Sequence, residues 1–253
     1  IEFKFNPDQH DTGDKRFLGE VGNFDGDDVV DIILKQPVSA EFIATELFRF
    51  FAYDNPEPEV IRPIAATFRE SNYSIKAAMR AILKSAAFSS EKAYRAKIKS
   101  PTEFVVGAVR SLDIATDKYL GMNVLSGVLG PMEQMGQTLL NPPDVSGWDG
   151  GETWINSSTL LERLNFINTL SSGRNRSLPF DSEKLLGPLA DSNETSLAYF
   201  NEILLDGAMN LEDRQIIAAY LSGVDKQSGA NGRVEKLNSL VYLMMSSPEY
   251  HLA

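Results

Sequence analysis

The sequence predicts an all-α fold, an irregular bundle of roughly eight to eleven helices joined by long loops rich in glycine and proline. Three observations support this prediction. Apolar residues recur at helical spacing along most of the chain, and several of these stretches open with a residue that caps helices. No alternating apolar pattern is longer than Glu2–Phe5, so a short extended segment is expected only near the N-terminus.

Length and composition fit one mostly helical domain over residues 1–253, with a sub-boundary near residues 172–195. The chain has no cysteine, which excludes disulfides, thiolate nucleophiles and cysteine zinc sites. It carries 24 Lys and Arg against 35 Asp and Glu, a net charge of −11. This balance argues against a nucleic-acid partner, because neutralising phosphates requires clustered cations. No apolar run approaches the roughly 20 residues of a membrane span.

In the first half of the chain, residues 1–26 are expected to be extended or loop, because four glycines and several aspartates interrupt them. Apolar stripes then predict helices, in turn, around residues 29–33, 42–51, 61–68 and 74–83. Ser74 is placed to cap the last of these helices.

In the second half, Ser100-Pro101-Thr102-Glu103 has the form of a capping box with proline at the first helical position. Gly130-Pro131 is expected to break or kink the next helix. Residues 141–155 are expected to form a loop, after which Asn156, Ser157 or Ser158 caps a helix. Residues 172–195 are polar and linker-like. The remaining helices are expected around 196–206, 211–222 and 233–246.

Both tryptophans of the chain, Trp148 and Trp154, lie in the expected loop at residues 141–155, with Gln137 before it and Asn156 after it. Exposed indoles on a glycine-rich loop can stack on sugar rings or cations, so these four residues are candidate ligand contacts. A structural alternative stands beside this interpretation. Buried indoles would pin a loop that has few backbone hydrogen bonds, while Gln137 and Asn156 satisfied backbone groups.

His10 and Asp11 form a second candidate ligand site, because a histidine beside a carboxylate can act as a general base or as half of a metal site. The chain has only two histidines, which excludes histidine-rich metal centres. The structural alternative is that His10 and Asp11 bond loop amides while Lys15 pairs with an acid.

Asn23-Phe24-Asp25-Gly26-Asp27-Asp28 is rich in carboxylates and suggests calcium, but its spacing does not match an EF-hand loop. The alternative is that Asp25 or Asp27 caps a helix and the other acids favour its first turn. We assign no metal ligands and no cofactor from the sequence.

An ordered set of short motifs runs along the chain: His10-Asp11-x-Gly13-x-Lys15, Gly22-Asn23-x-x-Gly26-Asp27-Asp28, Leu47-Phe48-Arg49-Phe50-Phe51, Lys99-Ser100-Pro101-x-Glu103, Met135-Gly136-Gln137, Pro142-Pro143-x-Val145-x-Gly147-Trp148 and Trp154-Ile155-Asn156. Together they resemble the bacterial "domain of unknown function 1800" family. The resemblance implies a mostly helical fold in an exported, extracytoplasmic protein, but no established activity and no catalytic residues. It also implies that this chain is the C-terminal part of a longer member, whose upstream half would be a partner.

Two functional hypotheses follow. The favoured one is a non-enzymatic binding or assembly module outside the cytoplasm, with a glycan or a protein as partner. It rests on the absence of a recognisable catalytic motif and on sequence motifs built from Gly, Pro, Trp and Asn. The alternative is a hydrolase that uses Asp or Glu for acid–base chemistry, with or without a divalent cation, at His10–Asp11 and Asp25–Asp28. A third possibility is a structural half of a larger protein.

Overall fold

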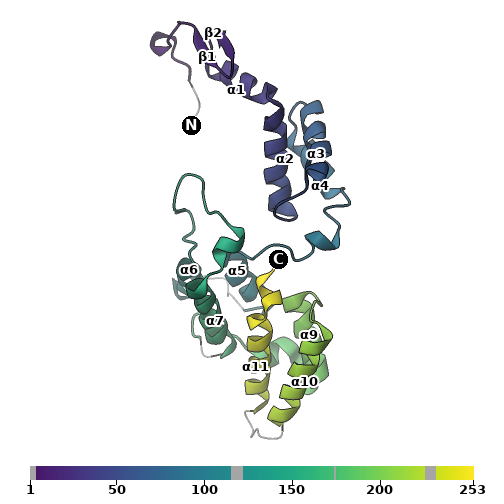
Figure 1. Ribbon diagram of the computed structural model, residues 1–253. Helices are drawn as coiled ribbons and strands as arrows, with labels where there is room; N and C mark the ends of the chain where they lie inside the picture. The colour runs from purple at the N-terminus through teal and green to yellow at the C-terminus, as the bar shows by residue number, and fades with distance from the viewer. Residues whose placement is uncertain (1–3, 115–121, 174, 226–231) are drawn as a thin grey trace. The chain divides into compact units, whose positions relative to one another are not determined.

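The computed structural model describes residues 4–114, 122–173, 175–225 and 232–253. These residues contain eleven α-helices and one β-hairpin (Figure 1). The all-α prediction is confirmed. None of the helices within these residues combines the length and apolar character needed to cross a membrane. The chain divides into two compact units, Ile1–Ala96 and Lys97–Ala253.

The first unit begins with the short 3₁₀ helix η1 (Pro7–Gln9) and an antiparallel hairpin of β1 (Lys15–Phe17) and β2 (Glu20–Gly22). Leu18 and Gly19 form the hairpin turn with φ values of 47° and 88°. Two positive φ values suit the right-handed twist of a tight hairpin. The sequence did not reveal these strands, because three residues are too few to show an alternating pattern.

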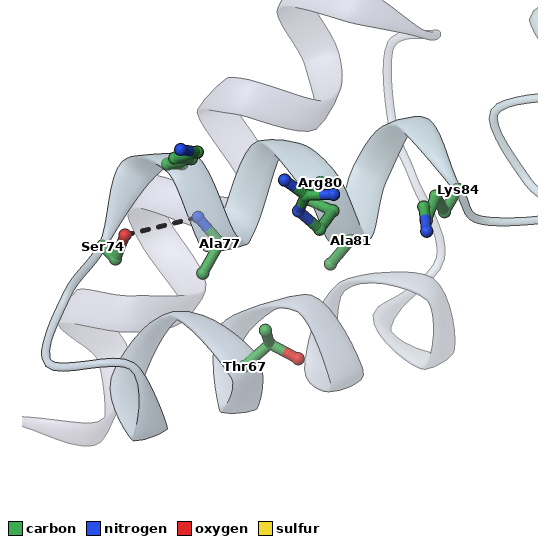
Figure 2. Close-up of a pocket in the computed structure, with 7 residues that line it drawn as sticks. Thr67, Ser74, Ala77, Arg80, Ala81 and Lys84 are labelled. Carbon is green, nitrogen blue, oxygen red and sulfur yellow. Dashed lines mark hydrogen bonds between the residues drawn. The ribbon is translucent and has the colours of Figure 1, made fainter.

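Four helices complete the first unit, followed by the 3₁₀ helix η2 (Glu91–Ala93): α1 (Gly26–Lys35), α2 (Pro37–Phe51), α3 (Pro58–Glu70) and α4 (Ile75–Leu83). Small residues of α2, Ala40 and Ala44, are fully buried and let α3 and α4 approach closely. Phe48 and Phe68 fill the remaining space of this core. As predicted, Ser74 caps α4, and its hydroxyl accepts a hydrogen bond from the Ala77 amide at 3.4 Å (Figure 2).

The second unit contains seven α-helices and three 3₁₀ helices among its described residues: α5 (Pro101–Ser111), α6 (Met122–Gln134), η3 (Gly151–Trp154), α7 (Ser157–Ser171), α8 (Ser182–Leu186), η4 (Gly187–Asp191), α9 (Asn193–Leu205), α10 (Leu211–Asp225), α11 (Gly232–Ser246) and η5 (Pro248–His251). Its core is built mainly from fully buried apolar side chains of α5, α7, α9 and α11, including Phe104, Ile167, Phe200 and Leu240.

The first and last residues of the second unit pair with each other. The Lys99 amide donates to the His251 carbonyl at 2.8 Å, and the Ala253 amide donates to the Lys97 carbonyl at 2.7 Å. Ile98 and Leu252 face each other in an antiparallel bridge. We call these paired segments, residues 97–99 and 251–253, the terminal clasp.

Several predicted boundaries are confirmed and some are not. Ser100 and Glu103 form the expected capping box of α5. Helix α6 continues through Pro131 to Gln134, so Gly130-Pro131 does not end it. The expected linker at 172–195 lies inside the second unit and contains α8 and η4. The single-domain organisation over 1–253 stays a prediction.

Candidate functional site

The loop between α6 and α7 is fastened where it begins. Helix α6 ends at Gln134, and Gly136, two residues later, has a φ of 97°, a backbone conformation that favours glycine. The Gln137 amide then donates to the Met132 carbonyl at 2.9 Å, the long-range bond of a Schellman cap. The Gln137 side-chain oxygen accepts from both the amide and the hydroxyl of Thr102, at 2.9 and 2.8 Å. Gln137 therefore ties the loop to the first turn of α5.

The same loop is also fastened where it ends. The Asn156 side-chain oxygen accepts from the amides of Ser158 and Thr159, at 2.9 and 3.0 Å, and caps α7. The Thr159 hydroxyl donates to the Trp154 carbonyl at 2.9 Å. Only 8% of the Trp154 surface is exposed, so its ring packs into the protein. Trp148 is half-buried.

Between these attachments the loop extends away from α6 and α7 (Figure 1). Leu140 and Val145 are fully exposed on it. The Ser146 hydroxyl and amide both donate to the Asp144 carboxylate, and these bonds lower the pKa of Asp144. The contacts of Gln137, Asn156 and Trp154 are those of the structural alternative; ligand binding at Gln137, Trp148, Trp154 and Asn156 stays a prediction.

The structure brings His10 and Asp11 together with Lys15 and Asn23. The Lys15 ammonium donates to the carbonyls of Asp11 and Gly13 and to the Asn23 side-chain oxygen, which also lies 3.2 Å from His10 Nε2. Asp11 Oδ1 accepts from the Gly13 amide at 2.8 Å. Among the described residues, Lys15 therefore bonds neutral oxygens and no acid. Ligand binding at His10 and Asp11 stays a prediction.

The carboxylates at the start of α1 are engaged in helix capping. Asp25 accepts from the amides of Asp27 and Asp28, and the Asp28 side chain accepts from the Asp25 amide at 3.0 Å. This reciprocal arrangement satisfies backbone groups that a helix start leaves unpaired. Among the described residues, no three His, Cys, Asp or Glu side chains gather in a way that could hold a metal ion.

A cationic cluster that the sequence did not reveal lies inside the second unit. Arg163 of α7 is fully buried, and its Nη2 donates to the Lys99 carbonyl at 2.8 Å. The Lys99 ammonium lies 4.1 Å from the centre of the Tyr250 ring. His251 stacks on Phe104 at 5.1 Å between ring centres.

The pKa values of this cluster follow its burial. Burial lowers the pKa of Arg163 to about 10. Burial, with the nearby charges of Arg163 and Lys99, lowers the pKa of His251 to about 4. Burial also raises the pKa of the Tyr250 hydroxyl. His251 is therefore neutral at pH 7 and adds no further charge beside the buried Arg163 and the half-buried Lys99.

The second unit also has a cleft of about 340 Å³ beside the C-terminal half of α7. We call it the neutral cleft, because its lining carries no charged side chain: Asn168, Ser171, Ser172, Tyr220, Asn238, Ser239, Tyr242 and Leu243. These residues come from α7, α10 and α11 and the residue that follows α7. The cleft combines aromatic rings, carboxamides and hydroxyls, a set that suits an uncharged polar ligand.

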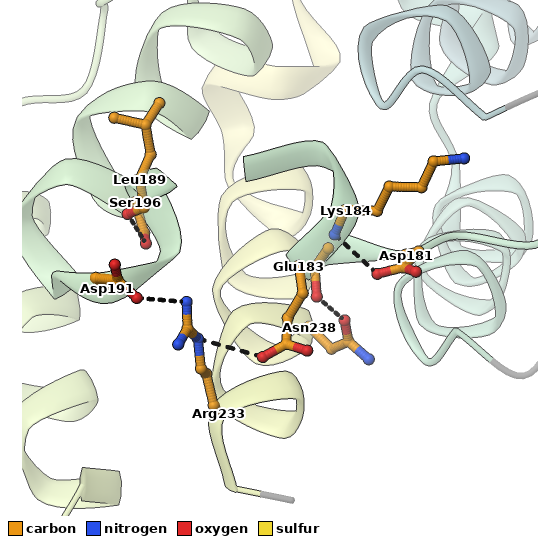
Figure 3. Close-up of polar contacts among 9 residues, drawn as sticks. Asp181, Glu183, Lys184, Leu189, Asp191, Ser196, Arg233 and Asn238 are labelled. Carbon is orange, nitrogen blue, oxygen red and sulfur yellow. Dashed lines mark hydrogen bonds and ion pairs between the residues drawn. The ribbon is translucent and has the colours of Figure 1, made fainter. Parts of the chain in front are cut away.

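Several polar groups of the neutral cleft are available to a ligand. The Asn168 carboxamide and the hydroxyls of Tyr220 and Tyr242 bond no other described residue. Asn238 is oriented by the Ser182 hydroxyl, which lies 2.9 Å from its side-chain oxygen (Figure 3). That contact leaves the Asn238 amide nitrogen without a partner among the described residues.

Ion pairs hold the segment that orients Asn238. Arg233 of α11 contacts Glu183 at 3.2 Å and Asp191 at 2.8 Å (Figure 3). Asp181 caps α8 by accepting from the Lys184 amide at 3.0 Å. The two ion pairs of Arg233 join α8 and η4 to α11, the helix that carries Asn238.

A family model described as "Protein of unknown function (DUF1800)" matches residues 1–252. The chain belongs to this family. The resemblance drawn from the ordered motifs is thus confirmed over nearly the whole chain. No curated protein and no solved structure matches it.

Three motifs that carry the DUF1800 resemblance make structural contacts in this chain. Lys15 bonds oxygens of its own loop, and Gln137 joins the loop between α6 and α7, called the long loop below, to α5. Lys99, in the terminal clasp, donates from its ammonium to the Tyr250 carbonyl. The neutral cleft lies outside these motifs. Spacing could not reveal it, because its residues lie on three helices, and α7 is far in sequence from α10 and α11.

Proposed function

We propose that this DUF1800 chain is a non-enzymatic binding module that works outside the cytoplasm and recognises a neutral glycan through the neutral cleft. One observation carries the proposal: in a chain with a net charge of −11, two tyrosines and two asparagines line a cleft without any charged side chain. The extracytoplasmic location is supported by the exported character that the family resemblance implies.

The cleft chemistry matches the surface of a sugar. Sugar hydroxyls donate and accept hydrogen bonds, and their C–H faces pack against aromatic rings. Tyr220 is 44% exposed and offers such a ring, while Asn168 and Asn238 offer amide groups at its side. The volume of about 340 Å³ falls within the range of small-ligand pockets.

The hydrolase hypothesis has less support from the described carboxylates. A general acid needs a raised pKa. Instead, a hydrogen bond from Lys92 lowers the pKa of Glu57, and bonds from Ser146 lower that of Asp144. Asp25 and Asp28 bond the start of α1. A protein partner that docks on the loop between α6 and α7 stays an alternative prediction, and the full exposure of Leu140 and Val145 on this loop supports it.

The proposal is tested by titrating the chain with a panel of neutral oligosaccharides in a calorimeter and analysing each sugar afterwards. We expect binding with the sugar recovered intact. Tyr220→Ala and Asn168→Ala should each weaken binding about five- to tenfold, through lost stacking and lost hydrogen bonds. Tyr94→Ala is the matched control, because Tyr94 is 53% exposed and does not line the cleft.

Three results would overturn this proposal. The first is that no neutral sugar binds. The second is that a sugar binds with an affinity that neither cleft substitution changes. The third is release of new reducing ends, which would show hydrolysis instead of binding.

A further inference from the structure

A second recognition surface lies in the first unit, in a groove of about 380 Å³ between α3 and α4 (Figure 2). We call it the basic groove, and its lining residues are Thr67, Ser74, Lys76, Ala77, Arg80, Ala81 and Lys84. Ala77 and Ala81 point towards α3, where Thr67 lies opposite (Figure 2). Their small side chains leave room in the groove beside the longer basic side chains.

The groove has three cations, Lys76 and Arg80 on α4 and Lys84 directly after it. They are spaced four residues apart, which places successive residues about 6 Å apart along the helix axis. Like charges at this spacing repel each other and destabilise a helix. Lys76, Arg80 and Lys84 form no ion pair or side-chain hydrogen bond with other described residues. Within the part of the chain that the structure describes, they have no acidic partner, although the chain has 35 acidic residues.

The direction of α4 adds to the positive potential of the groove. Lys76 is the second residue of the helix, at the end where the helix dipole is positive and acids are normally favoured. Helix α4 has no acid in its first turn, whereas α1 has Asp27 and Asp28 there. The charge of Lys76 and the dipole therefore act in the same direction on an anion in the groove.

We propose that the basic groove binds a small phosphate-bearing anion. Arg80 lies between the two lysines and has the planar fork that pairs with two phosphate oxygens, while Lys76 and Lys84 act as flanking point charges. A small ligand is favoured over a long polyanion, because the net charge of −11 repels polyanions and the groove has the volume of a small-ligand site. This proposal is independent of glycan binding at the neutral cleft.

The test is a calorimetric titration of the whole chain with inorganic pyrophosphate, repeated with orthophosphate, at low ionic strength. We expect pyrophosphate to bind, and Arg80→Gln to weaken binding tenfold or more, about the effect of losing a charge-assisted pair. Arg62→Gln is the matched control, since Arg62 is an exposed arginine of α3 outside the groove lining. Orthophosphate binding as tight as pyrophosphate would identify a single phosphate group as the ligand.

Thermal unfolding of Arg80→Gln separates loss of binding from loss of fold. We expect an unchanged or higher melting temperature, because the substitution removes two like-charge repulsions on α4. The proposal is overturned if pyrophosphate does not bind the wild-type chain, or if Arg80→Gln and Arg62→Gln weaken its binding equally. It is also overturned if sodium chloride at matched ionic strength produces the same heat.

Discussion

The guanidinium carbon of Arg163 lies 4.7 Å from the centre of the Phe104 ring. Both residues are fully buried, and no described residue forms an ion pair with Arg163. The aromatic face and the Lys99 carbonyl are therefore the contacts that compensate a buried positive charge. Its Nε and Nη1 atoms are buried without a hydrogen-bond partner among the described residues.

This contact predicts how the second unit tolerates changes at position 163. Arg163→Ala should lower the free energy of unfolding by about 2–4 kcal/mol, because it leaves a cavity beside Phe104. Arg163→Met should cost clearly less, because it fills the cavity and removes a charge that is expensive to bury. Urea denaturation of both variants measures the difference. Equal losses would show that the bond to Lys99, and not the packing, dominates.

His251 predicts a pH dependence of stability. Its pKa is lowered from 6.5 to about 4 by burial and by Arg163 and Lys99, so between these values the unfolded chain binds a proton that the folded chain does not. Stability should therefore fall as pH falls from about 6.5 to about 4, by up to about 3 kcal/mol.

This dependence is measured by urea denaturation across the same pH interval. His251→Phe keeps an aromatic ring against Phe104 and removes the titrating group. Its stability curve should be flatter than that of the wild-type chain by the amount assigned to His251. Identical slopes for the two proteins would refute the assignment.

The cap at Asn156 predicts a local effect on α7. Asn156→Ala removes two side-chain hydrogen bonds at the helix start and should cost about 1 kcal/mol. Asn156→Ser should restore most of this loss, because serine is also a good cap. Denaturation reports the stability, and glycan titration of the same variants reports binding. Weaker glycan binding by an Asn156 variant that is still folded would support the prediction that Asn156 contacts the ligand.

The two tryptophans should differ in fluorescence. Trp148→Phe leaves Trp154, whose buried indole should emit at shorter wavelength and resist acrylamide. Trp154→Phe leaves the half-buried Trp148, which should be quenched more readily. A glycan that protected Trp148 from quenching would place the contact on the long loop. Quenching of Trp148 that the glycan leaves unchanged would agree with binding in the neutral cleft.

Helices and their caps could be predicted because the information is local. Asp25, Ser74, Ser100 and Asn156 each lie just before an apolar stripe, and each caps the expected helix. Pro131 does not end α6, which continues for three more residues, and the kink that Gly130-Pro131 also predicts stays a prediction.

The neutral cleft, the basic groove and the burial of Arg163 could not be predicted, because they depend on tertiary contacts. Tyr220 and Asn238 lie on different helices, and each alone is an ordinary residue of a polar helix face. Lys76 and Arg80 follow the pattern of any solvated face until the groove beside α3 is seen. Arg163 is an arginine in a helical stripe, and only the structure shows that it is fully buried.

The terminal clasp places the first and last residues of the second unit side by side. A short linker between Ala253 and Lys97 would join them without disturbing a helix, and new ends could open in the long loop near Leu140. Such a circularly permuted unit should keep the neutral cleft. The same closure would let this unit be inserted as a cassette into a surface loop of another protein.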